Sequence, residues 1–259
     1  MTWSDDAFTM TCATSGVEHA IHVTTPFRYE SLDAAPLIVC LDGAWTAGTV
    51  RDATRIMSMS GEAPEAIVAS LSFTDDSMSG YLRSRTKWFC PTQWVPPEVT
   101  GVKGLKAEDA GHALTYLAFI RDQVLPRLAD EYRIGERWLV GHSFSGLFGL
   151  RVLFSEPDCF DKYLLASPSV WWHDRVMLDI EAEYAASHDD LAATVFLSAG
   201  QEEDALGTDF NMVGNVVDLA ARLEGHAYPS LKLTHQVLPA ESHSSTIGAA
   251  ISQGLRWLR

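Results

Sequence analysis

The hexapeptide GHSFSG at residues 141–146 constrains this chain more than any other segment. Residues 137–141 predict a buried strand, and the almost wholly apolar residues 144–154 predict a buried helix. A serine in so tight a strand-to-helix turn needs small neighbours, and its hydroxyl is exposed at the end of the strand. The pattern predicts that Ser143 is a nucleophile and that the N–H of Phe144 helps to hold an oxyanion.

A serine hydroxyl is a weak nucleophile and needs a general base. In this type of turn the order along the chain is serine, acid, histidine. Four histidines follow the serine: His188, His226, His235 and His243. His235 alternates with apolar residues in a predicted strand, so we expect it to be structural. His243 follows that strand in a polar loop before the last predicted helix, and we expect it to be the base.

A third residue should orient the imidazole and stabilise its cation. Three consecutive acids, Glu202, Glu203 and Asp204, follow the predicted strand at residues 193–199. The carboxyl end of a strand is a suitable place for such a group. On spacing alone, any of the three acids can fill the role.

Short apolar runs alternate with helical patterns along the whole chain. The alternation predicts one α/β domain over residues 1–259, with a mostly parallel central sheet and helices on both faces. Residues 74–105 lack a regular pattern and predict a long active-site loop. We expect strands at residues 17–24 (antiparallel), 36–41, 65–73, 137–141, 163–166, 193–199 and 231–238, and helices at 49–59, 108–132, 144–154, 212–223 and 246–258.

The composition excludes several classes of partner. The formal net charge of −15 disfavours nucleic acid and anionic membranes, which need a basic surface. No metal-ligand spacing and no nucleotide-binding loop occurs, so we expect no metal and no cofactor. Residues 1–6 lack the features of a secretory signal, and the four cysteines are far apart, so we expect free thiols and a cytoplasmic protein.

Several motifs between Pro36 and His243 resemble those of the Putative esterase family of α/β hydrolases. This branch includes siderophore esterases, esterase D and mycolyltransferases. The similar segments are LDG at 41–43, SRT at 84–86 with PT at 91–92, GHSFSGL at 141–147, ASPSVWW at 166–172, GQEE at 200–203 and SHS at 242–244. The sequence departs from the family pattern in two places: Ser145 stands in place of glycine, and WFC at 88–90 stands in place of a more polar run.

The resemblance implies an α/β-hydrolase fold and singles out Glu203 as the acid beside His243. It also implies that the N–H of Ala44 is a second oxyanion donor, together with that of Phe144. Arg85 matches a family arginine and is a candidate for binding a polar substrate group; a structural pair with Asp75 or Asp76 is the alternative. Aromatic residues in the predicted loops suggest an apolar substrate pocket, and the candidates are Trp45, Trp88 and Trp172.

These residues together predict a serine esterase that hydrolyses a small-molecule carboxylic ester through an acyl-enzyme on Ser143. Kinship with the family suggests a lactone or a siderophore-type ester. Two alternatives use the same sequence features. One is an acyltransferase with the same triad, and the other is a non-catalytic binding protein that keeps the hydrolase fold.

Overall fold

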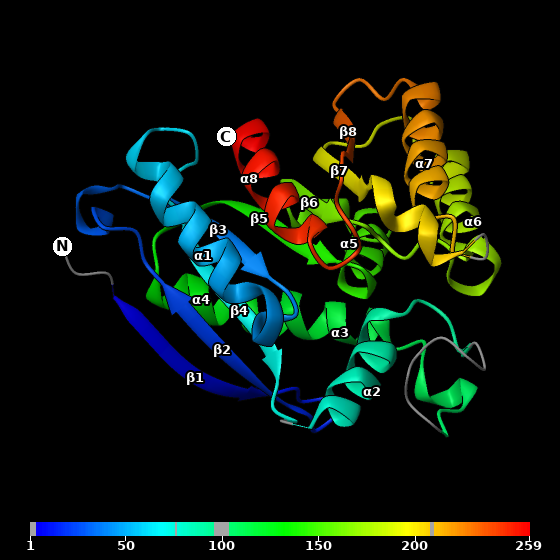
Figure 1. The fold of residues 1–259 in the computed structure, drawn as a ribbon. Coiled ribbons are helices and arrows are strands. Elements are labelled where there is room, and N and C mark those ends of the chain that lie inside the picture. The colour runs from blue at the N-terminus through cyan, green and yellow to red at the C-terminus, as the bar shows by residue number, and fades with distance from the viewer. Residues whose placement is uncertain (1–3, 76, 96–103, 208–209) are drawn as a thin grey trace. The chain divides into compact units, whose positions relative to one another are not determined.

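The computed structural model describes residues 4–75, 77–95, 104–207 and 210–259. The chain divides into two compact units, residues 1–138 and 139–259, here called the N-terminal and C-terminal units. Each unit contains parallel strands with helices packed on them (Figure 1). The chain therefore belongs to the α/β class that the sequence predicts.

The N-terminal unit contains strands β1 (Asp5–Thr11), β2 (Glu18–Thr24), β3 (Ala35–Cys40) and β4 (Ile67–Phe73). They are ordered β1-β2-β4-β3, followed by the first half of β5 (Ile134–His142). Strand β2 pairs antiparallel with both of its neighbours, so the antiparallel strand predicted at residues 17–24 is confirmed. Strands β3 and β4 are parallel and almost fully buried.

Two helices follow these strands. Helix α1 (Gly43–Met59) packs on β4 and β3 and begins at Gly43, earlier than the predicted Thr49. Helix α2 (Met78–Phe89) lies inside the segment predicted as a loop. Ser77 caps α2 by accepting the Gly80 N–H at 3.0 Å. The predicted irregular stretch at residues 74–105 therefore contains a helix, and its residues 76 and 96–103 lie outside the described part.

The helix predicted at residues 108–132 forms three consecutive pieces. They are α3 (Ala113–Phe119), a π turn (Ile120–Val124) and α4 (Leu125–Glu131). The π turn ends two residues before Pro126, which has no N–H to give to the preceding turn. Single-turn 3₁₀ segments occur at Tyr29–Ser31 and Ala107–Asp109.

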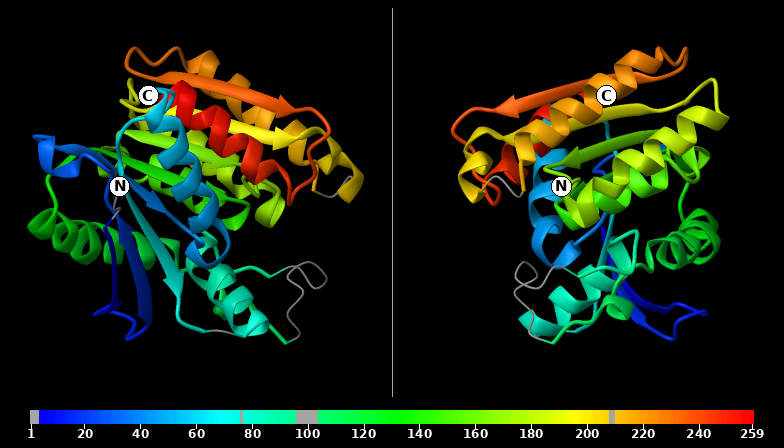
Figure 2. Two further views of the ribbon diagram at one scale, coloured as in Figure 1. Left: turned by 60° about the vertical axis from the view of Figure 1, so that its left-hand side comes forward. Right: turned by 90° about the vertical axis from the view of Figure 1, so that its right-hand side faces the viewer.

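The C-terminal unit contains the second half of β5, then β6 (Lys162–Ala166), β7 (Thr194–Gly200) and β8 (Lys232–Leu238). Strands β6, β7 and β8 are parallel, and β8 lies at the edge (Figure 2). The helices are α5 (Phe144–Leu153), α6 (Trp172–Ser187), α7 (Met212–His226) and α8 (Thr246–Leu258), with 3₁₀ turns at Pro157–Cys159 and Gln201–Leu206. The sequence patterns predict each of these helices except α6.

Three backbone hydrogen bonds connect the loops that follow the strands of the C-terminal unit. The Ser143 N–H donates to Ala166 O at 3.0 Å, and the Ser167 N–H donates to Ser198 O at 2.7 Å. The Glu202 N–H donates to Glu241 O at 3.0 Å. Because parallel strands end at the same edge, these bonds gather polar residues from four loops at one end of the unit.

Candidate active site

Ser143 lies in the strained turn that its motif predicts. Its backbone has φ 62° and ψ −118°, and it is the residue directly before α5. A Cβ on Gly141 would lie 2.3 Å from the carbonyl oxygen of Ser145, so the turn closes only over a residue without a side chain. A non-glycine residue held at positive φ stores strain that the surrounding structure must maintain.

The serine that replaces the usual glycine, Ser145, fits this turn. Its buried hydroxyl accepts the His142 N–H at 2.9 Å and lies 2.9 Å from the His142 carbonyl oxygen, to which it donates. The side chain therefore bonds to the backbone across the turn rather than pushing it open. This compensation is not visible in the sequence, because it depends on the turn geometry.

His243 lies in the loop between β8 and α8, at the same end of the unit. Its Nδ1 is 2.8 Å from Glu203 Oε2, and its side chain is about one-third exposed. His142 Nε2 is 2.8 Å from the His243 carbonyl oxygen, and the two rings are 4.7 Å apart. His142, which directly precedes Ser143, thus links the nucleophile turn to the loop of His243. Sequence reasoning missed this contact.

Glu203 is the acid that the structure brings to His243. It is buried, whereas Glu202 and Asp204 are exposed. Burial acts to raise the pKa of Glu203, but hydrogen bonds from His243, Ser167 and the Gly200 N–H outweigh it, so the pKa lies below its ordinary value. The group is therefore an anion that can stabilise a cationic imidazole.

The Ser143 hydroxyl lies beside another serine hydroxyl, that of Ser169. Within the described residues, its Oγ hydrogen-bonds to Ser169 Oγ at 3.4 Å and not to His243. Bonds between nucleophile and base are often unformed in structures without a substrate. The C-terminal unit thus holds Ser143, Glu203 and His243 at one end, with only the acid–histidine bond made.

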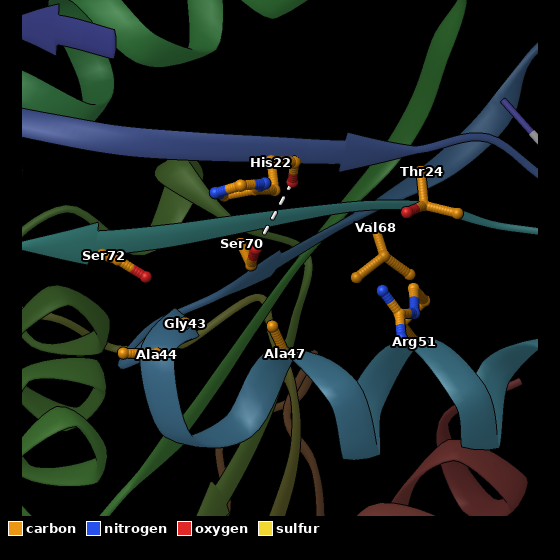
Figure 3. Close-up of a pocket in the computed structure, with 9 residues that line it drawn as sticks. All are labelled: His22, Thr24, Gly43, Ala44, Ala47, Arg51, Val68, Ser70 and Ser72. Atoms are coloured by element: carbon orange, nitrogen blue, oxygen red, sulfur yellow. Dashed lines mark hydrogen bonds between the residues drawn. The ribbon is translucent and has the colours of Figure 1, made fainter. Parts of the chain in front are cut away.

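Ala44 is the second residue of α1 in the N-terminal unit, and it is exposed. Asp42, directly before α1, has a left-handed backbone (φ 56°, ψ 40°), and its side chain makes no hydrogen bond to the helix end. Ala44 lines a cavity of about 220 Å³ with His22, Arg51 and other residues between α1 and the strands (Figure 3). It also lines a cavity of about 410 Å³ with Trp45.

Arg85 has an aspartate partner other than the two predicted. Its Nε and Nη2 donate to the two carboxylate oxygens of Asp42 at 2.8 and 3.0 Å, and both side chains are buried. The indole of Trp45 covers the guanidinium at 4.7 Å. Asp75 bonds to Ser77 instead, and Asp76 lies outside the described residues.

The three tryptophans predicted to bind substrate differ in exposure. Trp45 is 45% exposed and faces the larger cavity. Trp88 is buried and packs near His112. Trp172 is fully buried and meets Phe144, which follows Ser143, edge to face at 5.4 Å. Only Trp45 has the exposure of a direct substrate contact.

No group of metal-binding side chains occurs among the residues that the structure describes. The four cysteines are all buried and free.

A mostly parallel sheet with packed helices, a strained serine turn and an acid–histidine pair define the class of α/β hydrolases. Residues 13–226 match the model of the family described as Putative esterase, and the chain belongs to this family. Esterases resemble this chain over most of its length, and the chain is a hydrolase of ester bonds.

Two characterised relatives come from a bacterium and a fungus. The ferri-bacillibactin esterase BesA of Bacillus subtilis is 25% identical over 232 residues, which cover 86% of this chain and 78% of the relative. The siderophore triacetylfusarinine C esterase of Aspergillus fumigatus is 26% identical over 272 residues, covering 93% and 88%.

Solved structures share the fold. The siderophore hydrolase EstA of Aspergillus nidulans superposes with a TM-score of 0.85 at 24% identity, covering 98% of this chain and 93% of that one. The BES protein of Bacillus cereus gives 0.84 at 24% identity, covering 100% and 95%. The predicted α/β-hydrolase fold is confirmed.

Proposed function

We propose that this chain is a serine esterase in which Ser143 is the nucleophile, His243 the general base and Glu203 the acid that orients the base. The observation that carries the proposal is the 2.8 Å bond between Glu203 Oε2 and His243 Nδ1. A bond to Nδ1 leaves Nε2 as the nitrogen that can take the serine proton. His142 supports the arrangement because it binds the carbonyl of His243 and directly precedes the nucleophile.

The reaction proceeds in two steps on these residues. Ser143 Oγ attacks the ester carbonyl carbon while His243 Nε2 accepts the hydroxyl proton, and a tetrahedral oxyanion forms. The N–H of Phe144, at the start of α5, donates to this oxyanion, and the family resemblance implies the N–H of Ala44 as a second donor. The alcohol leaves with the proton from His243, and water activated by the same imidazole then releases the acid.

The substrate that the comparisons favour is an ester or lactone of the siderophore type. The characterised relatives are named for siderophores: ferri-bacillibactin in one and triacetylfusarinine C in the other. Beside Ala44, the cavity of about 410 Å³ with the exposed indole of Trp45 offers an apolar surface for part of such a substrate.

Replacement of the nucleophile tests the proposal. Ser143→Ala should reduce hydrolysis of p-nitrophenyl acetate by at least about a thousandfold, since the acyl-enzyme can no longer form. The variant should also lose labelling by a fluorophosphonate. Ser187→Ala, a change at an exposed serine at the end of α6, is the control and should behave as wild type. Undiminished hydrolysis by Ser143→Ala, or a label on another residue, contradicts the proposal.

We also propose a reducing compartment, the cytoplasm, as the place of action. Its support is the free state of Cys12, Cys40, Cys90 and Cys159, which are buried. None of the described helices combines the length and the apolar character needed to cross a membrane. The redox state is tested by extracting the protein in the presence of an alkylating reagent and counting the alkylated cysteines after denaturation. Four alkylated cysteines are expected, and recovery of a disulfide contradicts the proposed compartment.

A further inference from the structure

Ser167, the first residue after β6, touches the acid of the proposed triad. Its hydroxyl donates to Glu203 Oε1 at 2.5 Å, and neither side chain is exposed to solvent by more than 1%. Oε2 of the same carboxylate meets His243. One oxygen of Glu203 is therefore fixed by Ser167, and the other is presented to the histidine.

The other two donors to Glu203 Oε1 differ from Ser167 in position or in the length of their hydrogen bond. The Gly200 N–H donates at 2.7 Å from the start of the same turn, and it fixes the carboxylate only relative to its own loop. Thr246 Oγ1 also donates to Oε1, but at 3.3 Å, and the same hydroxyl makes a shorter bond of 2.7 Å to Ser242 O. Ser167 is thus the side chain that makes the shorter hydrogen bond to Oε1, and it comes from the loop after the neighbouring strand β6.

The backbone of Ser167 holds the hydroxyl in this place. The residue has φ 43°, a left-handed conformation that is uncommon for residues with a side chain. Its N–H donates to Ser198 O on β7 at 2.7 Å, which anchors the turn to the strand that leads to Glu203. A strained non-glycine residue whose side chain bonds to a buried anion indicates that the side chain is needed there.

We propose that Ser167 is a positioning residue for catalysis, whose hydroxyl keeps the Glu203 carboxylate aimed at His243. The proposal rests on the function assigned to Ser143, Glu203 and His243. His243 is the titratable group that contacts this carboxylate in the C-terminal unit. Ser167 also belongs to the segment that reaches the nucleophile, because Ser169, two residues on, lies beside Ser143 Oγ.

Two substitutions separate the hydroxyl from the backbone turn. Ser167→Ala removes the hydroxyl and keeps the strain, whereas Ser167→Gly removes the hydroxyl and relieves it. We expect both to lower kcat per active site by about tenfold to a hundredfold, the effect of one hydrogen bond to a charged group. KM should change less than about threefold, since a fully buried side chain does not reach substrate.

The pH profile supplies a readout that a purely structural role does not move. Without the Ser167 hydroxyl, the Glu203 carboxylate has one hydrogen-bond donor fewer. The anion then interacts more strongly with a protonated His243 imidazole. The acid limb of kcat should therefore move to higher pH in both variants. Ser198→Ala is the matched control, because Ser198 is a buried serine on β7 whose Oγ has no hydrogen-bond partner in the described residues.

Active sites are counted by fluorophosphonate titration of Ser143 before each measurement. If the titrated Ser167→Gly enzyme has the wild-type kcat and acid limb, the inference is wrong, even when Ser167→Ala is impaired. That result leaves the proposed function intact as long as the probe labels Ser143. If the probe labels another residue in the wild-type protein, the proposed function fails on its own.

Discussion

Glu203 binds His243 through one carboxylate oxygen, Oε2, at a distance of 2.8 Å. The other oxygen, Oε1, accepts short hydrogen bonds from the Ser167 hydroxyl and the Gly200 N–H and a longer one from Thr246. The carboxylate therefore cannot rotate away from the imidazole without losing two hydrogen bonds at a buried site. The neighbouring acids Glu202 and Asp204 are exposed and have no comparable burial.

Glu203→Gln should lower kcat by about a hundredfold to ten-thousandfold, because the amide cannot stabilise a cationic imidazole and can favour the wrong tautomer. Glu202→Gln changes an exposed acid one residue earlier and should leave kcat within about twofold. Both constants are measured with p-nitrophenyl acetate at saturating concentration. Equal effects of the two substitutions would remove Glu203 from the triad.

The turn around the nucleophile should tolerate a change at one small residue and not at another. Gly141→Ala places a Cβ 2.3 Å from Ser145 O and should cost about 3 kcal/mol of stability, with loss of fluorophosphonate labelling. Ser145→Gly restores the usual pattern but removes the hydrogen bonds to His142, and should cost about 1–2 kcal/mol while labelling persists. Urea unfolding measures both. A harmless Gly141→Ala contradicts the geometry.

Exposure predicts different effects at two tryptophans. Trp45→Ala should raise KM for an aromatic ester by about threefold to tenfold, since its indole faces a cavity. Trp172→Ala should instead lower the free energy of unfolding by about 3–5 kcal/mol, since its side chain is fully buried. Trp257→Ala, at an exposed tryptophan of α8, is the control for KM. An unchanged KM in Trp45→Ala rules out this residue as a substrate contact.

His19 on β2 should make the protein sensitive to acid. Burial lowers its pKa to about 4, and its ring lies among Phe73, Tyr116 and Phe119. Because the folded state resists protonation, the unfolded state binds more protons between pH 4 and the ordinary histidine pKa of about 6.5. Stability should therefore fall as pH drops through this window, by about 3 kcal/mol in total for this residue.

His19→Phe removes this titration and should flatten the dependence of unfolding free energy on pH across the same window. His22, which is exposed on the same strand, provides the control substitution His22→Gln, and its slope should match that of the wild type. Unfolding in urea at a series of pH values measures the slopes. A wild-type slope in His19→Phe contradicts the assignment to this histidine.

Much of the architecture follows from local patterns. Strands β2 to β8 and helices α5, α7 and α8 lie close to their predicted ranges, because alternation and helical spacing record which face of an element is buried. Helix α2 was missed, since its apolar residues are mixed with Ser, Arg and Lys. Helix α6 was also missed: its many polar residues and a left-handed start at His173 obscure the period.

Sequence by itself determined the nucleophile candidate, Ser143. The strand before it, the small residues of the turn and the apolar helix after it form one continuous segment of the chain, so a local pattern reveals them. It also limited the base to the loop of His243. Local pattern leaves three acids open as the partner of His243, and only the family resemblance singles out Glu203. The contacts themselves are formed by tertiary structure. Glu203 is separated from His243 by 40 positions, and His142 from His243 by 101.

Arg85 illustrates the same limit in the N-terminal unit. Its partner, Asp42, is 43 positions away, whereas Asp75 and Asp76, the aspartates suggested by proximity, lie ten and nine positions before it in the sequence. Local pattern specifies which face of an element is buried, but it does not specify which distant polar group meets another there. That choice depends on the order of the strands and on the loops that their ends bring together.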